Sequence, residues 1–297
     1  MCRFLLYMGP PVSMAKLVTE PANSLINQSF QAKLRAEPLN GDGFGLAWYM
    51  PQIDTIPALF KSISPAWNNQ NLHNIARVTQ SPCILAHVRA ATFARTVNES
   101  NCHPFTWRHY AFCHNGDVGG FGELRRKLLE GLGEEAFHLI HGNTDSEHFF
   151  ALVVDYLLKL PPETNPTSAM VTAMNQAIDH IIRLQEEMGI EEKNYMNFAF
   201  TDGKRAVVTH CTTDKPKEAD SLFVHTGGQY SHVKGRTQII TRANIQREGG
   251  SVIVSSEPLT EDPGWRAVKI NEMVVIDEDM SVTTRDIPSA IEASAKS

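Results

Sequence analysis

The sequence contains few cysteines, and none of them form a pair at a recognisable spacing. Five cysteines occur, at positions 2, 83, 102, 113 and 211, and no two of them are separated by only two residues. Disulfide-stapled secreted domains and structural zinc sites both depend on paired cysteines, so neither is expected here. A reducing cytoplasm is the compartment that this cysteine usage favours.

An excess of positive charge and long apolar runs are also missing. Lysine and arginine number 27 against 33 aspartates and glutamates, which gives a formal net charge of −6. This balance gives no electrostatic reason to expect nucleic acid or an anionic membrane as a partner. The apolar run at the N-terminus stops at Gly9-Pro10-Pro11, too early for a signal-peptide core or a membrane span.

Several motifs that indicate cofactors or nucleophiles are absent. Gly41-x-Gly43-x-Gly45 lacks the G-x-G-x-x-G spacing and precedes a predicted strand, so it does not indicate a dinucleotide site. There is no P-loop and no G-x-S-x-G elbow. His138, His141 and His148 could suggest a metal, but no carboxylate pattern supports them, and a surface helix is favoured. The sequence therefore predicts no cofactor and no metal.

The chain does contain enough apolar material for a large core, with 42% hydrophobic residues. Strands are predicted in the front part and again after residue 190, with long helices at 121–131, 144–159 and 167–188 between them. This order favours an α+β layered fold over alternating βαβ units. We expect a single domain over residues 2–287, with motifs for chemistry in 2–150, a β-rich continuation in 190–287 and a disordered tail at 288–297. Strands are expected at 2–8, 46–50, 58–62, 83–89, 110–114, 195–201, 205–211, 221–225, 236–242, 251–255, 266–270 and 272–277, and shorter helices at 13–20, 24–35 and 68–79.

The second residue is the most informative one. Removal of Met1 would leave Cys2 with a thiol and a free α-amine on the same residue. An α-amine titrates at about 7.7–8.0, so near neutral pH it can accept the proton of the thiol without help from a distant histidine. Cys2 is therefore a candidate nucleophile with its own base.

Polar residues gather where predicted strands end, which often marks a site. The segments are Asp42–Gly45, His87–Thr92, Cys102–Phe105, His114–Gly116 and Thr144–Glu147. Together with Cys2, they resemble the class II glutamine amidotransferases, in the order in which that family carries its motifs. The opening Met1-Cys2-Arg3-Phe4-Leu5 is most similar to a branch of stand-alone γ-glutamyl hydrolases, which includes a fungal glutathione-degrading subunit and an ergothioneine-pathway amidohydrolase.

The resemblance implies a four-layer αββα sandwich of the N-terminal nucleophile hydrolase type and cleavage of a γ-glutamyl amide through a thioester on Cys2. Asn115 and Gly116 would stabilise the oxyanion. The substrate would be held at its α-carboxylate and α-ammonium, with His87, His103, Asp42 and Gly43 as scaffolding of the site. The substrate-binding residues would be Arg89, whose guanidinium fork matches a carboxylate, Thr92 and Asp145.

Structural interpretations of the same residues remain open at this stage. Arg89 could form an ion pair at the edge of the core, and Asn115-Gly116 could be a type I′ turn. Thr144 and Asp145 could cap a helix, since Thr144-x-x-Glu147 fits a capping box. Ser255-Ser256-Glu257-Pro258 resembles a motif of the same branch but has no role that the sequence explains.

Alternatives also remain open for the activity as a whole. The chain could be a glutaminase subunit that supplies ammonia to a separate synthetase partner. It could also be a non-catalytic binding subunit, although a binder needs no nucleophile. The assembly also stays open, with a partner subunit or a homo-oligomer as the alternatives. The leaving group of the substrate has no recognisable sequence code.

Overall fold

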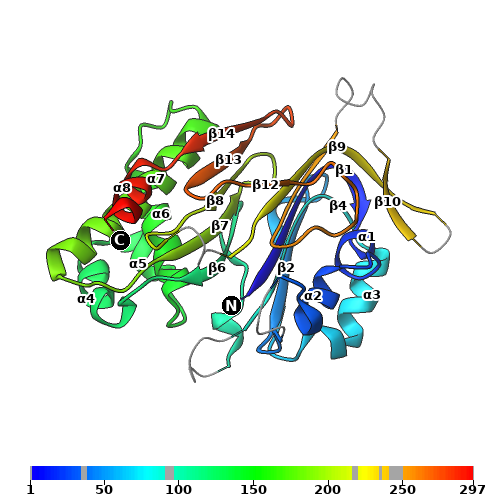
Figure 1. Cartoon of the computed structure of the whole chain (residues 1–297), viewed down its shortest axis with the longest axis horizontal. Helices are drawn as coiled ribbons and strands as arrows, with labels where there is room; N and C mark the ends of the chain where they lie inside the picture. The colour runs from blue at the N-terminus through cyan, green and yellow to red at the C-terminus, as the bar shows by residue number, and fades with distance from the viewer. Residues whose placement is uncertain are drawn as a thin grey trace.

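The computed structural model describes residues 2–34, 39–90, 97–215, 220–233, 236–240 and 250–296, without the side chains of 229–240. Among these residues, two antiparallel sheets stack face to face, and helices cover both outer faces (Figure 1). The predicted four-layer αββα sandwich is therefore confirmed.

The first sheet contains the N-terminal strand, which begins directly after Cys2. Its strands follow the order β10-β9-β11-β1-β4-β2-β3, so that β1, the N-terminal strand, lies in the interior of the sheet. A short strand, β12, pairs with β9 beside this path. The bounds are β1 Arg3–Ser13, β2 Phe44–Met50, β3 Asp54–Ser62, β4 Gln80–Val88, β9 Phe223–Val233, β10 Arg236–Ile240, β11 Ser251–Ser255 and β12 Arg266–Ala267.

The second sheet has the order β14-β13-β8-β7-β6-β5. Its strands stand in reverse sequence order, from the C-terminal strands at one edge to strands from the middle of the chain at the other, so the region after residue 190 completes the same sandwich. The bounds are β5 Phe105–Trp107, β6 Tyr110–Asp117, β7 Tyr195–Thr201, β8 Ala206–His210, β13 Glu272–Ile276 and β14 Val282–Asp286.

The helices divide between the two outer faces. Three short helices and a 3₁₀ turn lie over the first sheet, while the second group of helices, which includes the longest ones, lies over the second sheet (Figure 1). The first group is α1 Ala15–Val18, α2 Leu25–Gln31, α3 Gln70–Val78 and the turn Ala66–Asn68; a second 3₁₀ turn spans Glu99–Asn101. The other group is α4 Phe121–Gly131, α5 Glu134–His138, α6 Asp145–Lys159, α7 Pro166–Met188 and α8 Pro288–Ala295.

Strand alternation produces a separate apolar core in each space between layers. On β1, Leu5 and Tyr7 face the helices of the first sheet, whereas Phe4, Leu6 and Met8 face the second sheet. The inner faces of both sheets meet in a common cluster of buried residues. In the regular part of β1, before the irregularity that follows Met8, residues with the parity of Phe4, Leu6 and Met8 are therefore directed between the sheets.

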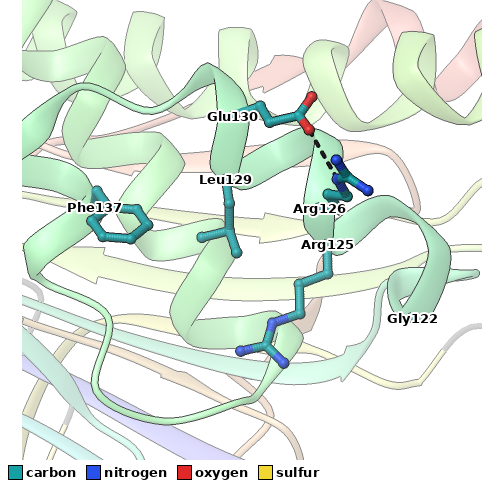
Figure 2. Close-up of a pocket in the computed structure, with 6 residues that line it drawn as sticks. All are labelled: Gly122, Arg125, Arg126, Leu129, Glu130 and Phe137. Atoms are coloured by element: carbon teal, nitrogen blue, oxygen red, sulfur yellow. Dashed lines mark hydrogen bonds and ion pairs between the residues drawn. The ribbon is translucent and has the colours of Figure 1, made fainter.

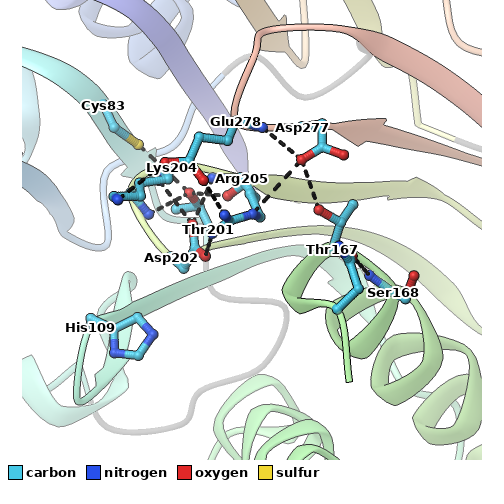
Figure 3. Close-up of polar contacts among 12 residues, drawn as sticks. Cys83, His109, Thr167, Ser168, Thr201, Asp202, Lys204, Arg205, Asp277 and Glu278 are labelled. Atoms are coloured by element: carbon cyan, nitrogen blue, oxygen red, sulfur yellow. Dashed lines mark hydrogen bonds and ion pairs between the residues drawn. The ribbon is translucent and has the colours of Figure 1, made fainter. Parts of the chain in front are cut away.

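Polar contacts also join the layers at one end of the sandwich (Figure 3). Arg205 pairs with Asp202 at 3.0 Å and with Asp277 at 3.8 Å, which ties the β7–β8 hairpin to the end of β13. Thr167 at the start of α7 donates to Asp277 at 2.9 Å. Cys83 of the first sheet lies 3.7 Å from Thr201 of the second, between Sγ and Oγ1.

Most of the predicted elements are confirmed, with boundary shifts of a few residues. The short elements β5, α5 and β14 were not predicted. The disordered tail is wrong for most of its length, because α8 occupies 288–295 and packs against α7 with Ala290 buried. In the part of the chain that the structure describes, no helix combines the length and the apolar character needed to cross a membrane.

Candidate active site

Strand parity brings the main predicted site residues into the space between the sheets. Cys2 continues the inner-facing series of β1, and His87 and Arg89 continue that of β4. Asn115 shares the parity of the inner-facing residues of β6. In the register of β1 and β4, Arg3 is opposite Val88 and Phe4 opposite His87, so Cys2 reaches the turn that follows β4.

The Cys2 side chain is buried against this turn. Its sulfur lies 3.4 Å from the backbone nitrogen of Ala90 and 3.5 Å from its carbonyl oxygen. Burial raises the pKa of the Cys2 thiol, while the Ala90 amide and the Arg89 cation oppose that increase. A thiol held in this state needs a base before it can attack as a thiolate.

Hydrogen bonds fix the backbone of Arg89, whereas part of its side chain has no hydrogen-bond partner among the described residues. Its N–H donates to the Gly43 carbonyl at 2.8 Å, and its carbonyl accepts from Asp42 N at 3.0 Å. Gly43 has φ +110°, and a Cβ there would meet Cys102 Sγ at 2.8 Å, so a side chain is excluded. The Arg89 side chain is 5% exposed, yet its Nη1 has no hydrogen-bond partner among the described residues. The alternative of an ion pair at the core edge finds no support in this arrangement.

Asn115 and Gly116 lie within a strand rather than in a turn. They pair with Asn197 and Met196 of β7, which excludes the type I′ turn alternative. Asn115 is fully buried, and neither polar atom of its side-chain amide has a partner among the described residues. A Cβ on Gly116 would lie 1.7 Å from the Tyr195 carbonyl oxygen, so only glycine fits. The amide of Asn115 is thus available to a ligand.

Asp145 is the first residue of α6 and is 8% exposed. One of its oxygens accepts from Val118 N at 2.9 Å, and the other accepts from Ser146 Oγ at 3.3 Å. Each oxygen keeps a further lone pair, so the carboxylate can still accept from an ammonium group. The predicted helix cap is present beside it, because Thr144 Oγ1 accepts from Glu147 N at 3.2 Å. The reciprocal half of the capping box is not formed: Glu147 accepts from His141 N and Gly142 N.

His87 and His103 lie against each other, with ring centroids 4.2 Å apart. Burial lowers the pKa of His87 to about 3 and that of His103 well below its usual range, so both rings are neutral. His87 Nε2 donates to the His114 carbonyl at 3.1 Å, which links β4 to β6 across the two sheets. This geometry agrees with a scaffolding role, and that role stays a prediction.

Three charged residues, Arg3, Glu257 and Asp220, were given no role in the site from the sequence, although the first two lie in segments noted for their resemblance to the hydrolase branch. Arg3 and Glu257 form a buried ion pair with 3.3 Å between Arg3 Nε and Glu257 Oε1. The carboxylate of Asp220 acts on the Cys2 thiol in the direction that raises its pKa. The sequence pointed to Glu257 only as part of the segment Ser255–Pro258, without a role, and the pairing of β1 with β11 brings it to Arg3. The predicted Thr92 lies outside the described residues.

One hollow on the surface is lined by none of the predicted site residues. This hollow lies on the outer helices, lined by Gly122, Arg125, Arg126, Leu129, Glu130 and Phe137 (Figure 2). Arg126 is paired there with Glu130 at 3.1 Å. Within the described ranges, no group of three or more histidines, cysteines, aspartates or glutamates is arranged to hold a metal ion.

Comparison with known proteins gives one consistent result. Residues 14–296 match the family of class II glutamine amidotransferases. A probable glutamine amidotransferase of Saccharomyces cerevisiae, DUG3, is 40% identical over 296 residues, which cover 93% of this chain and 82% of that protein. A γ-glutamyl-hercynylcysteine sulfoxide hydrolase of Mycolicibacterium smegmatis is 31% identical, with coverage of 96% and 99%.

Solved structures agree with the fold. A glutamine aminotransferase class-II domain protein from Silicibacter pomeroyi has a TM-score of 0.62 at 25% identity, over 96% of this chain and 99% of that one. The glutamine phosphoribosylpyrophosphate amidotransferase of B. subtilis has a TM-score of 0.59 at 14% identity, over 96% of this chain and 49% of that one. The second similarity concerns the fold alone.

Proposed function

Because the chain belongs to the class II glutamine amidotransferases, we propose that it hydrolyses a γ-glutamyl amide with Cys2 as the nucleophile. One observation carries the proposal: two buried polar groups, Arg89 Nη1 and the Asn115 amide, have no hydrogen-bond partner among the described residues, and strand parity directs both residues, like Cys2, between the sheets. Such groups are costly to leave unpaired, so their presence favours a polar ligand that completes them.

The glutamyl part of the substrate offers matching charges. Its α-carboxylate would pair with the guanidinium of Arg89, and its α-ammonium with the carboxylate of Asp145. Thr92 would contribute a hydroxyl. This places the γ-carbonyl next to the Cys2 sulfur, with the scissile bond between the two sheets.

The reaction then proceeds through a thioester. The α-amine of Cys2 takes the thiol proton as sulfur bonds to the γ-carbon, and Asn115 Nδ2 with Gly116 N–H stabilises the oxyanion. The carbonyl re-forms as the C–N bond breaks, and the ammonium returns its proton to the departing amine. Water then gives a proton to the free amine and attacks the thioester. The C–S bond breaks, the thiol regains its proton and glutamate leaves.

The leaving group would be larger than ammonia, as in glutathione or a related γ-glutamyl compound. The named hydrolase from M. smegmatis, which aligns over nearly its whole length, supports this choice. A second candidate is a glutaminase that passes ammonia to a separate synthetase, because DUG3 is named a probable glutamine amidotransferase. Incubation of the purified protein with glutamine, glutathione and other γ-glutamyl amides, followed by glutamate release, separates the two.

The test of the nucleophile is the Cys2→Ala variant. It keeps the α-amine, Arg89 and Asp145, so it should bind substrate, but turnover should fall to background because no thioester can form. Intact-mass measurement should show active protein without Met1. A diazoketone analogue of glutamine should add one label to the wild type at Cys2 and none to the variant.

The other cysteines provide an internal control. Burial raises the thiol pKa of Cys83, Cys102, Cys113 and Cys211, so these residues should label slowly. Label on one of them with Cys2 untouched, full activity with Met1 retained, or undiminished turnover of Cys2→Ala would refute the proposal.

A further inference from the structure

Glu257 is a buried carboxylate at which several segments meet. It follows β11 and is fully buried. Its Oε1 accepts from Arg3 Nε at 3.3 Å and from Leu34 N at 3.2 Å. Its Oε2 accepts from Lys33 N at 3.0 Å and from Asn23 Nδ2 at 3.4 Å. Both oxygens are therefore used, and the donors come from β1 and from the residues on either side of α2.

The Arg3 guanidinium extends this network to the nucleophile. Its Nη1 donates to the carbonyl oxygen of Cys2 at 3.0 Å. The next residue along is held as well, because Phe4 N donates to Ser256 Oγ at 3.1 Å and Ser256 N donates to the Phe4 carbonyl at 3.1 Å. The segment Ser255-Ser256-Glu257 thus holds the first peptide units of β1 from one side.

An N-terminal residue needs this kind of support. Once Met1 is removed, Cys2 is attached to the protein by one peptide bond, so rotation about its Cα–C bond moves both the amine and the thiol. Because Arg3 holds the carbonyl of Cys2, the Cα–C bond about which the amine and the thiol rotate is itself fixed in place. The contact of the sulfur with Ala90 then selects one orientation.

We propose that Glu257 is a positioning residue for the nucleophile, acting through Arg3 on the carbonyl of Cys2. This inference rests on the proposed function. A buried ion pair contributes little net stability compared with apolar residues of similar size, so stability alone does not explain why charges occupy this place. The ion pair does have a specific geometric effect: the Arg3 guanidinium donates through Nε to Glu257 and through Nη1 to the carbonyl of Cys2, so Glu257 orients the group that holds Cys2.

The test compares Glu257→Gln with Asn23→Ala. The Gln variant keeps the shape but removes the charge that orients Arg3, whereas Asn23→Ala removes a donor to the opposite oxygen and leaves Arg3 in place. In folded Glu257→Gln we expect kcat and the rate of diazoketone labelling at Cys2 to fall by up to about 100-fold, the loss that a misplacement of about 1 Å can cause. Asn23→Ala should keep both rates. Substrate affinity, measured in a Cys2→Ala background, should not change with Glu257→Gln.

Further variants decide between positioning and a merely structural role. Arg3→Met should resemble Glu257→Gln, and the double variant should be no worse than either, because the two residues act as one unit. If Glu257→Gln does not fold, Arg3→Lys serves instead, since an ammonium keeps the charge but cannot hold both partners in the same way; its labelling should be slow.

Each contrary result has a distinct meaning. Labelling at the wild-type rate in folded Glu257→Gln or in Arg3→Lys would overturn the positioning role alone. An equal fall in Asn23→Ala would overturn it too, because the cause would then be loss of local packing. A wild-type protein that does not label at Cys2 would overturn the proposed function, and the positioning role with it.

Discussion

At the scale of single residues, the candidate site combines strict backbone requirements with unused polar groups. Gly43 and Gly116 have no room for a Cβ; the Gly43 carbonyl accepts from the backbone N–H of Arg89, and Gly116 follows Asn115 directly in β6. The side chains of Arg89 and Asn115 are buried with polar atoms that lack partners among the described residues. An unsatisfied buried group costs about 1–3 kcal/mol, and a ligand that pairs with it recovers that free energy on binding. The same residues therefore lower stability and raise affinity.

Arg89→Lys tests this exchange. Lysine keeps the charge but cannot form two parallel bonds to a carboxylate, so KM for γ-glutamyl substrates should rise by roughly 10- to 100-fold, as for loss of a hydrogen bond to a charged group. The value of kcat should change less, because the lost contact is present in both ground and transition states. Steady-state kinetics measure both values. Arg77→Lys, on the exposed face of α3, is the matched control. An unchanged KM in Arg89→Lys would mean that the glutamyl group binds elsewhere.

At the scale of elements, strand alternation and one helix start determine where the site residues lie. Alternation directs Cys2, Arg89 and Asn115 inward from three different strands or their ends. The start of α6 supplies Asp145 from the outer layer, since its carboxylate reaches back to Val118 N. A carboxylate in the first helical turn is also favoured by the helix dipole. Under the proposed function, the cap of α6 would therefore matter for substrate binding as well as for the helix.

Thr144→Ala should expose this link. The variant loses the hydroxyl that accepts from Glu147 N, which should lower the free energy of unfolding by about 1 kcal/mol. Urea denaturation measures the loss, and KM should rise because Asp145 is the next residue. Thr144→Ser keeps the hydroxyl and is the control. If Ser and Ala destabilise equally, the methyl group of Thr144 rather than the cap is responsible.

At the scale of the whole molecule, the two sheets are held together by apolar contacts and by a few polar links. Tyr49 of the first sheet donates to the Thr201 carbonyl of the second at 3.2 Å. His87 of β4 donates to the His114 carbonyl of β6 at 3.1 Å. The second link passes through a titratable group, so it connects the stability of the sandwich to pH.

We expect acid to weaken the sandwich through His87. Burial lowers its pKa from an ordinary 6.5 to about 3 in the folded protein. Between these values the unfolded chain binds a proton that the native state does not, so the free energy of unfolding should fall as pH drops from about 6.5 toward 3. Guanidinium denaturation at several pH values measures the slope.

Two variants assign that slope to a residue. His87→Asn should give a shallower dependence, although His103 and His114 still contribute because burial lowers the pKa of each. His73→Asn, on the exposed face of α3, should leave the slope unchanged. A His87→Asn slope equal to that of the wild type would contradict the assignment.

The sequence by itself determined what depends on neighbouring residues. Long periodic segments such as α6 and α7, and buried strands such as β4, follow from patterns within a few turns of the chain. The set Cys2, Arg89, Asn115 and Asp145 was also predicted from local motifs. Weak local patterns failed: β14 is largely exposed and at a sheet edge, and α8 is a short Ala/Ser-rich segment held by its contact with α7.

Only the tertiary structure decided which distant residues act together. Glu257 contacts Arg3 across 254 positions of the chain because β11 pairs with β1. Asn115-Gly116 looked like a turn by its own residues, but the pairing with β7 makes it strand. Which strands pair, and how two sheets pack, depends on the burial of whole sheet faces. A short segment of sequence does not contain that information. The sequence thus supplied the reactive groups, and the packing of the sheets determined which of them face one another.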